Sequence, residues 1–579
     1  MAQHLLYGVA IETNDRFQEL RTQHGRAKLL LIRDDLQENG PGDILTRRVI
    51  HDFDPLAASD HPAYVLQSDV AAVRGVIEAA IGIFTNYAFF RHGADGNVCG
   101  AKSLPIFAGY FPDLCLLRRI IMTTRAQLLA RWAHSQAQLA GWRTTLASEI
   151  AAKFAARTAD NAGSLEPQDL RRLYDLWIDC AEEAYAAVVR RDEFCKAQAE
   201  GINTACDLLA GAVEPSSAHD PAGGFGPSWA AGLAGGIAPP PGVGPEALPS
   251  TPLLHTPHGA AGSSLRDPVW QRDKVVLYRY RPLPFVQAAP VQPVLIAFSL
   301  VNRPHVLDIR PDHSLIRNLL AAGLEVYLID WGYPDANDRT ISLSDYLERY
   351  LAGCVDHVLK SEHVRNLNLI GVCQGGTLSL CYCALHPRQI ANLVLLATPV
   401  DFHTPENLLT RWARHLDMGL LTRSGNLHGG LLTAMFMALS PFRLMHQKYA
   451  ALLDPAADSR ALELFGRMEQ WICDSPDQAA TAARQFVQWF YQENRLVRGS
   501  LRLHSRPISL RKVGQPVLNI YGTQDHIVPP SATTALRKHL GTRDYTEHAL
   551  DTGHVGLYVS RRAGQSVPRM ICSWLRARS

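Results

Sequence analysis

The chain has 579 residues, of which 47% are hydrophobic and 19% are charged. This composition is typical of a globular protein with about two to four domains. The formal net charge is only +2 at pH 7, and no basic block is present, so no nucleic-acid partner is indicated. No signal peptide is expected, and the most hydrophobic early window, residues 70–90, is broken by Arg74 and Glu78 and predicts no transmembrane segment. Eleven cysteines without a secretion signal favour reduced thiols in the cytoplasm.

The first half of the chain divides by composition into three parts. Residues 1–110 carry no motif that we can assign, whereas residues 111–210 are predicted to be mainly helical. Within that region, residues 116–154 show a long apolar periodicity, and a second helix is expected to begin near Ser164, with Pro167 in its first turn, and to run towards Leu209.

Residues 211–262 are dense in proline and glycine and almost free of charge, which predicts a flexible linker. Apolar residues nevertheless recur there at every fourth position from Phe225 to Ile237. They form either a segment that docks on a neighbouring surface or a series of incidental contacts, and the interspersed glycine and proline favour the second interpretation.

The remaining residues, 263–579, show the pattern of an α/β domain. Residues 274–280 alternate between polar and apolar, as an edge strand would. Residues 293–299, 324–330 and 392–398 are continuous apolar runs, which are typical of parallel strands buried on both faces. Helix-like segments such as 313–322 separate them.

A strand-like run within residues 366–377 leads into the sequence Gly371-Val-Cys-Gln-Gly-Gly376. This is the pattern of a nucleophile elbow, with cysteine where serine usually stands. The small glycines allow the tight turn, and the dipole of the following helix favours the thiolate of Cys373. Considered alone, the motif also fits a buried cysteine at the end of a glycine-containing strand.

The rest of the chain supplies partners for Cys373 in the order that this fold requires, which is nucleophile, acid and histidine. Asp525 follows the apolar strand-like run 515–522, and His554 follows a further strand-like run, 544–549. His526 adjoins the acid, where it either lines the site or packs within its own loop. His548 is a weaker rival to His554, because it lies inside the strand pattern.

Two backbone amides are expected to form an oxyanion hole. One is the N–H of Gln374, which follows the nucleophile. The other belongs to the loop of residues 300–305, which follows the strand-like run 293–299, and it is the amide of either Val301 or Asn302. The sequence alone does not choose between them.

Cysteine as nucleophile indicates acyl transfer from a thioester. A thiolate that attacks a thioester forms another thioester, so the acyl group stays activated for a later alcohol acceptor. Residues of about 402–512 form an insertion that is too long for an ordinary loop, and we expect a helical cap over the site. The cap is rich in aromatic residues: Trp412, Phe436, Phe442, Trp471, Phe486, Trp489 and Phe490.

Residues from about 268 to 579 resemble the catalytic subunit of a polyhydroxyalkanoate (PHA) synthase of the two-subunit kind, class III. The matching segments are 273–282, 301–304, 327–334, 371–376, 468–477, 525–529 and 553–560. The resemblance implies an acyltransferase that polymerises (R)-3-hydroxyacyl-CoA, such as 3-hydroxybutyryl-CoA, into polyester and carries the growing chain on Cys373. It implies that His554 activates the cysteine and that Asp525 activates the substrate hydroxyl, although orientation of His554 by Asp525 stays open.

The resemblance also implies self-association, as a homodimer or larger, and a cytoplasmic location on polyester granules. Residues 173–195 resemble the non-catalytic partner subunit of the same synthase class, so the two subunits appear fused in one chain. An unrelated amphipathic helical hairpin is the alternative. No metal or organic cofactor is expected.

Two other functions remain open at this point. One is a thioesterase or esterase of the α/β-hydrolase fold, in which water accepts the acyl group. The other is a non-catalytic granule-surface protein with a degenerate site, which the intact set of Cys373, Asp525 and His554 disfavours.

Overall fold

The computed structural model describes residues 112–160, 170–210, 263–448 and 459–579. Residues Asp113–Ser579 belong to one compact unit. The unassigned segment 1–110 and the predicted linker 211–262, including its apolar residues from Phe225 to Ile237, lie outside the described residues.

The N-terminal part of this unit is helical, as expected, and its described residues form α6 (Pro112–Asp160), α7 (Leu170–Val188) and α8 (Asp192–Ala210). The single helix predicted from Ser164 to Leu209 was wrong, because the chain turns between α7 and α8. Asp192 and Glu193 occupy the first turn of α8, where negative charge is stabilised by the helix dipole, so a new helix begins there. Ser164 and Pro167 lie outside the described residues.

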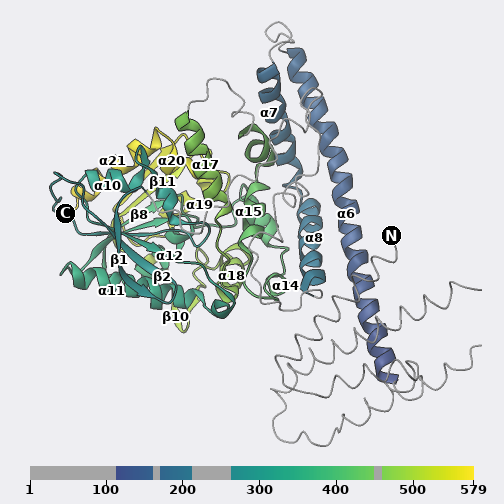
Figure 1. Cartoon of the computed structure of the whole chain (residues 1–579), viewed down its shortest axis with the longest axis horizontal. Coiled ribbons are helices and arrows are strands. Elements are labelled where there is room, and N and C mark those ends of the chain that lie inside the picture. Colours follow the sequence, from purple (N-terminus) through teal and green to yellow (C-terminus); the bar gives the residue numbers. More distant parts are fainter. Residues whose placement is uncertain (1–111, 161–169, 211–262, 449–458) are drawn as a thin grey trace, which may run out of the picture. The chain divides into compact units, whose positions relative to one another are not determined.

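The C-terminal part is built on an eight-stranded sheet with strand order β1-β2-β6-β3-β7-β8-β11-β12 (Figure 1). The strands from β6 to β12 in that order run parallel, and β1 and β2 are antiparallel to their neighbours. Their bounds are β1 (Arg266–Arg272), β2 (Val275–Tyr280), β3 (Val294–Ala297), β6 (Val326–Asp330), β7 (Leu367–Val372), β8 (Ile390–Leu396), β11 (Val517–Gly522) and β12 (Tyr545–Leu550).

The continuous apolar runs form strands β3, β6 and β8, which are buried along almost their whole length. The prediction that residues 274–280 form an edge strand was wrong. Strand β1 pairs with β2 and forms the edge. Its residues are half-buried or exposed, so its sequence lacks the apolar run that revealed the other strands.

Helices cover both faces of the sheet (Figure 1). One buried cluster packs η5, α11 and α12 against one face, and a second packs α10, α20 and α21 against the other. The helices around the sheet are α10 (Leu315–Ala321), η5 (Asp345–Leu351), α11 (Ala352–Ser361), α12 (Gln374–Leu385), α19 (Pro530–Thr534), α20 (Gly556–Val559) and α21 (Ala563–Arg576). The connections around the sheet also contain short elements: η3 (Pro304–Leu307), β4 (Asp308–Arg310), β5 (His313–Ser314), η4 (Ala336–Asp338) and η10 (Ala535–Lys538).

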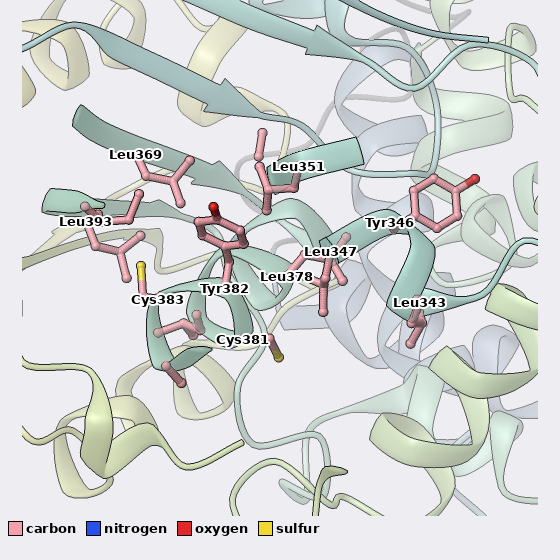
Figure 2. Close-up of a cluster of buried hydrophobic side chains, with 14 of the residues drawn as sticks. Leu343, Tyr346, Leu347, Leu351, Leu369, Leu378, Cys381, Tyr382, Cys383 and Leu393 are labelled. Carbon is pink, nitrogen blue, oxygen red and sulfur yellow. The ribbon is translucent and has the colours of Figure 1, made fainter. Parts of the chain in front are cut away.

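Figure 2 shows part of the first cluster, in which α12 packs against the sheet and against η5. Cys381 and Cys383 of α12 are buried there beside leucine side chains. Burial raises the pKa of the Cys381 thiol to about 12. Both cysteines therefore serve to pack α12 within this cluster.

The insertion between β8 and β11 is mainly helical. It contains α13 (Leu408–Ala413), α14 (Met418–Leu421), α15 (Gly429–Met437), η6 (Arg443–Gln447), α17 (Ser459–Cys473), α18 (Ala480–Phe486), η8 (Val487–Gln492), β9 (Arg502–Leu503), β10 (Arg506–Pro507) and η9 (Leu510–Lys512). Most of its aromatic side chains are buried in packing contacts; for example, Phe486 and Phe490 pack around Phe402.

Helices α7 and α8 pack on this insertion through two hydrophobic clusters, and we call the larger one the cap–helix cluster. Its members from the helices include Trp177 and Tyr185, and those from the insertion include Trp412 and Phe442. The buried Tyr185 hydroxyl donates a 2.7 Å hydrogen bond to the carbonyl of Ala438. Polar contacts surround the cluster, including Asn203 with His415 and Asp417, Asp179 with Arg443, and Asp207 with Arg423.

Among the helices that the structure describes, none has the length and apolar character needed to cross a lipid bilayer.

Two glycines provide a matched test of the packing. A Cβ at Gly375 would lie 2.2 Å from the carbonyl oxygen of Ala297, whereas a Cβ at Gly466 of α17 meets nothing within 4 Å. We expect Gly375→Ala to destabilise the protein by about 2–3 kcal/mol because backbone must move. Gly466→Ala should stabilise it by about 0.5–1 kcal/mol through helix propensity. Urea denaturation of both variants checks this, and equal effects would contradict it.

Candidate active site

The corner between β7 and α12 holds Cys373. Its backbone has φ 53° and ψ −122°, a conformation that is costly for a residue with a Cβ and is often found at functional sites. The amide of Cys373 donates to the carbonyl of Leu396 in the neighbouring strand, at 2.8 Å. Gly375 packs so closely on the end of β3 that only glycine fits. The corner is thus fixed from both sides, as the predicted elbow requires.

Asp525 lies on the loop after β11, in the predicted position. One carboxylate oxygen, Oδ1, accepts the backbone N–H groups of Ile527 at 2.9 Å and Val528 at 2.8 Å. The other, Oδ2, lies 2.7 Å from Nδ1 of His554. The side chain of Asp525 has no exposed surface, and that of His554 is 8% exposed. Both oxygens of a fully buried carboxylate are therefore engaged.

His554, on the loop after β12, joins Asp525 to Cys373. Burial alone would lower the pKa of His554, but the charge of Asp525, the negative charge of an ionised Cys373 and hydrogen bonds to both raise it well above its ordinary value. The arrangement therefore favours the protonated, imidazolium form of His554. The structure brings together the three residues that the sequence singled out for catalysis.

The loop after β3 lies beside the nucleophile. The amide of Val301 donates to the hydroxyl of Ser299 at 3.0 Å, and that hydroxyl lies 3.5 Å from Oε1 of Gln374. Gln374 is the first residue of α12, where backbone N–H groups have no partner within the helix. Asn302 has a left-handed backbone, with φ 59°. The two expected sources of oxyanion donors are thus connected through Ser299.

Sequence reasoning missed Ser299 and two tyrosines. Tyr491 comes from η8 of the insertion, and burial and the charge of an ionised Cys373 raise its pKa. The ring of Tyr558 lies edge-on to the ring of His554, at 6.4 Å. No local motif marks these residues, because they reach the site from segments distant in sequence. His526 is exposed beside Asp525, and His548 lies within β12.

Comparisons with known proteins match the two parts of the chain separately. A family model described as "alpha/beta hydrolase fold" matches residues 304–560. Another, described as "Poly(R)-hydroxyalkanoic acid synthase subunit (PHA_synth_III_E)", matches residues 126–212, which cover most of α6 and all of α7 and α8. The resemblance of the helical region to a synthase subunit is therefore confirmed.

Similar proteins are named as polymerase subunits. The poly(3-hydroxyalkanoate) polymerase subunit PhaC of Allochromatium vinosum is 46% identical over 56% of this chain and 92% of its own length. The PhaC subunit of Synechocystis sp. is 42% identical over 55% of this chain and 85% of its own length. Among solved structures, an esterase from Thermogutta terrifontis is 17% identical, covers 54% of this chain and 99% of its own, and has a TM-score of 0.34.

The α/β sheet, the position of the cysteine and the extent of these matches agree. The chain belongs to the PhaC family of poly(3-hydroxyalkanoate) polymerases and carries, ahead of its catalytic part, a region matching the class III synthase subunit.

Proposed function

We propose that the chain polymerises (R)-3-hydroxyacyl-CoA, with 3-hydroxybutyryl-CoA as the expected monomer, into polyester and releases CoA through a thioester on Cys373. The observation that carries this proposal is the arrangement of the half-buried Cys373 with the buried His554 and Asp525 at a nucleophile elbow. The names of the PhaC relatives support the polymer as product.

In the first step the thiolate of Cys373 attacks the carbonyl carbon of the acyl-CoA. The bond from this carbon to the sulfur of CoA breaks, and the CoA thiolate leaves with the proton of the His554 imidazolium. The raised pKa of His554 suits this step, because a protonated imidazole can stabilise the thiolate and then protonate the leaving group. The amide of Gln374 and an amide of the loop after β3 would stabilise the oxyanion.

In the second step His554, now neutral, takes the proton of an acceptor hydroxyl. The resulting alkoxide attacks the acyl group on Cys373, an oxoester forms, and the sulfur of Cys373 leaves as thiolate. One thioester is exchanged for another in the first step, so the driving force is kept for ester formation. Serine at position 373 would lose that driving force on acylation.

We infer that Asp525 acts through His554. Its Oδ1 accepts two backbone amides and its Oδ2 faces Nδ1 of the imidazole. A hydroxyl on the substrate would have to displace one of these bonds in a buried setting. This geometry favours orientation of His554 over direct activation of the substrate by the carboxylate.

The α6–α8 region is proposed to act as a built-in partner subunit. Its helices contact the insertion through the cap–helix cluster and the polar bonds around it. We further propose that the insertion acts as a cap that excludes water from the acyl-enzyme. Attachment to polyester granules and self-association are expected from the hydrophobic product and the family.

Substitution of the nucleophile tests the mechanism. We expect Cys373→Ala to abolish CoA release from (R)-3-hydroxybutyryl-CoA and the insoluble polyester, because no acyl carrier remains. Cys373→Ser should retain less than about 1% of the polymerisation rate, because its hydroxyl needs stronger activation than a thiol. CoA release is followed with a thiol reagent, and the product is pelleted and analysed.

The matched control is Cys383→Ala, which removes a buried thiol of the core cluster from α12, the helix that follows Cys373. It should retain polymerase activity when folded. Release of CoA with only free 3-hydroxybutyrate from the wild type would instead identify a thioesterase. No CoA release from a folded wild type would favour a non-catalytic granule protein.

The charge of Asp525 sets a second prediction. Asp525→Asn removes the charge that raises the pKa of His554, and burial then lowers that pKa. Above about pH 6.5, the ordinary value for histidine, the variant imidazole becomes neutral and no longer stabilises a thiolate. We expect alkylation of Cys373 by iodoacetamide at pH 7 to slow about ten-fold, and the two rates to converge above about pH 9.

Alkylation at Cys373 is read by peptide mass spectrometry, because the exposed Cys473 can react as well. Asp551→Asn is the matched control, since Asp551 lies on a nearby loop and bonds Gln524 and Thr523 instead of a histidine. An unchanged pH profile for Asp525→Asn, or the same shift in both variants, would contradict the role assigned to Asp525.

A further inference from the structure

The loop after β3 is fastened to the insertion by several side-chain hydrogen bonds. The loop comprises residues 299–303, and the segment that holds it, residues 471–478, connects the end of α17 to α18. We call these two stretches the oxyanion loop and the fastening segment. Because the loop carries the candidate donors Val301 and Asn302, the bonds that hold it bear on where those amides point.

Asn302 makes the first connection. Its side-chain Nδ2 donates to the carbonyls of Trp471 at 3.1 Å and Ile472 at 3.4 Å, at the end of α17. In return, the indole Nε1 of Trp471 donates to the carbonyl of Arg303 at 2.7 Å. The left-handed backbone of Asn302, with φ 59°, is uncommon for a residue other than glycine. The bonds of its side chain help to keep it there.

Gln478 makes the second connection, on the other side of the two candidate amides. Its Nε2 donates to the carbonyl of Leu300 at 2.6 Å. Its own backbone exchanges two hydrogen bonds with Leu427, so that Gln478 is itself fixed within the insertion. The carbonyls of Leu300 and Arg303 are thus both held from the insertion, and Val301 and Asn302 lie between them.

A buried ion pair secures the same region from the sheet. Arg303 contacts Asp330 at the end of β6, at 2.6 Å, with both side chains largely buried. The guanidinium lies over the ring of Tyr333, and the hydroxyl of Tyr333 donates to Asp474 of the fastening segment at 2.7 Å. Sheet, oxyanion loop and fastening segment therefore form one connected polar network.

We propose that the fastening segment positions the oxyanion loop, with Asn302 and Gln478 as positioning residues, so that oxyanion stabilisation depends on the seating of the insertion on the sheet. Preorganised amides lose much of their effect when they are displaced by about 1 Å. Movement of the fastening segment would displace the carbonyls of Leu300 and Arg303. The amides of the two residues between them, Val301 and Asn302, would then move as well. The inference rests on the proposed function only in taking Cys373 as the acyl acceptor.

Two variants and one control test the proposal. Asn302→Gly removes the side-chain bonds but tolerates the positive φ, and Gln478→Met removes the donor to Leu300 at similar size. Thr481→Val is the control, because Thr481 bonds Arg339, which lies between η4 and η5 and outside the oxyanion loop. Each full-length variant is compared with the wild type in thermal denaturation to establish that it is folded.

Two reactions of Cys373 separate positioning from access. Acylation by phenyl thioacetate, followed by thiophenol release, passes through an oxyanion, whereas alkylation by iodoacetamide does not. We expect Asn302→Gly and Gln478→Met to slow acylation about 10- to 100-fold, which does not exceed the effect of losing a whole oxyanion donor. Alkylation of Cys373 should stay within about two-fold, and Thr481→Val should change neither rate.

Equal slowing of both reactions would show that the variants alter access to Cys373 or its ionisation, and would overturn the proposal. Unchanged acylation in both variants would also overturn it, as would a wild type that phenyl thioacetate does not acylate. If the wild type accepts phenyl thioacetate but makes no polyester from (R)-3-hydroxybutyryl-CoA, the proposed polymerase function fails. In that case the acylation rates of the two variants still decide whether the fastening segment positions the oxyanion loop.

Discussion

The strand-to-helix corner at Cys373 is the constraint on which the rest of the site depends. Cys373 keeps its positive φ there because a carbonyl of the neighbouring strand accepts its amide N–H and because the end of β3 leaves no room beside Gly375. The same contact brings the oxyanion loop, which follows β3, against the start of α12. Nucleophile and candidate donors are therefore placed by one packing arrangement, in which a change at either side moves both.

The helical region ahead of the catalytic part reaches this corner indirectly. The cap–helix cluster contains Trp177 and Tyr185 of α7, and Tyr491 and Ile527 pack against it. Ile527 donates its amide to Asp525, and Tyr491 lies within the electrostatic influence of Cys373. A region that matches a separate synthase subunit thus supports residues next to two of the three catalytic candidates. Fusion in one chain places that support at every site without an association step.

The sequence predicted those features that local patterns determine. Buried parallel strands need apolar runs, and an elbow needs glycines around its nucleophile, so β3, β6, β8 and the position of Cys373 could be inferred. Strand β1 was missed because it is half-exposed, and the break between α7 and α8 was missed because helical periodicity nearly continues across it. Ser299 and Tyr491 escaped for another reason: their relation to Cys373 exists only once distant segments have packed.

The same packing bears on whether the acyl group on Cys373 would pass to an alcohol or to water. Cysteine, histidine and aspartate alone do not choose between water and an alcohol, since either can be deprotonated by His554. The choice must come from what can approach the acyl group on Cys373. In this chain the insertion supplies Tyr491, whose pKa is raised by burial and by the charge of an ionised Cys373, and it fastens the oxyanion loop through Asn302 and Gln478. An insertion that restricts the approach of water and also positions the oxyanion donors would make acylation efficient mainly when it covers the site. Hydrolysis is least able to compete in that covered state.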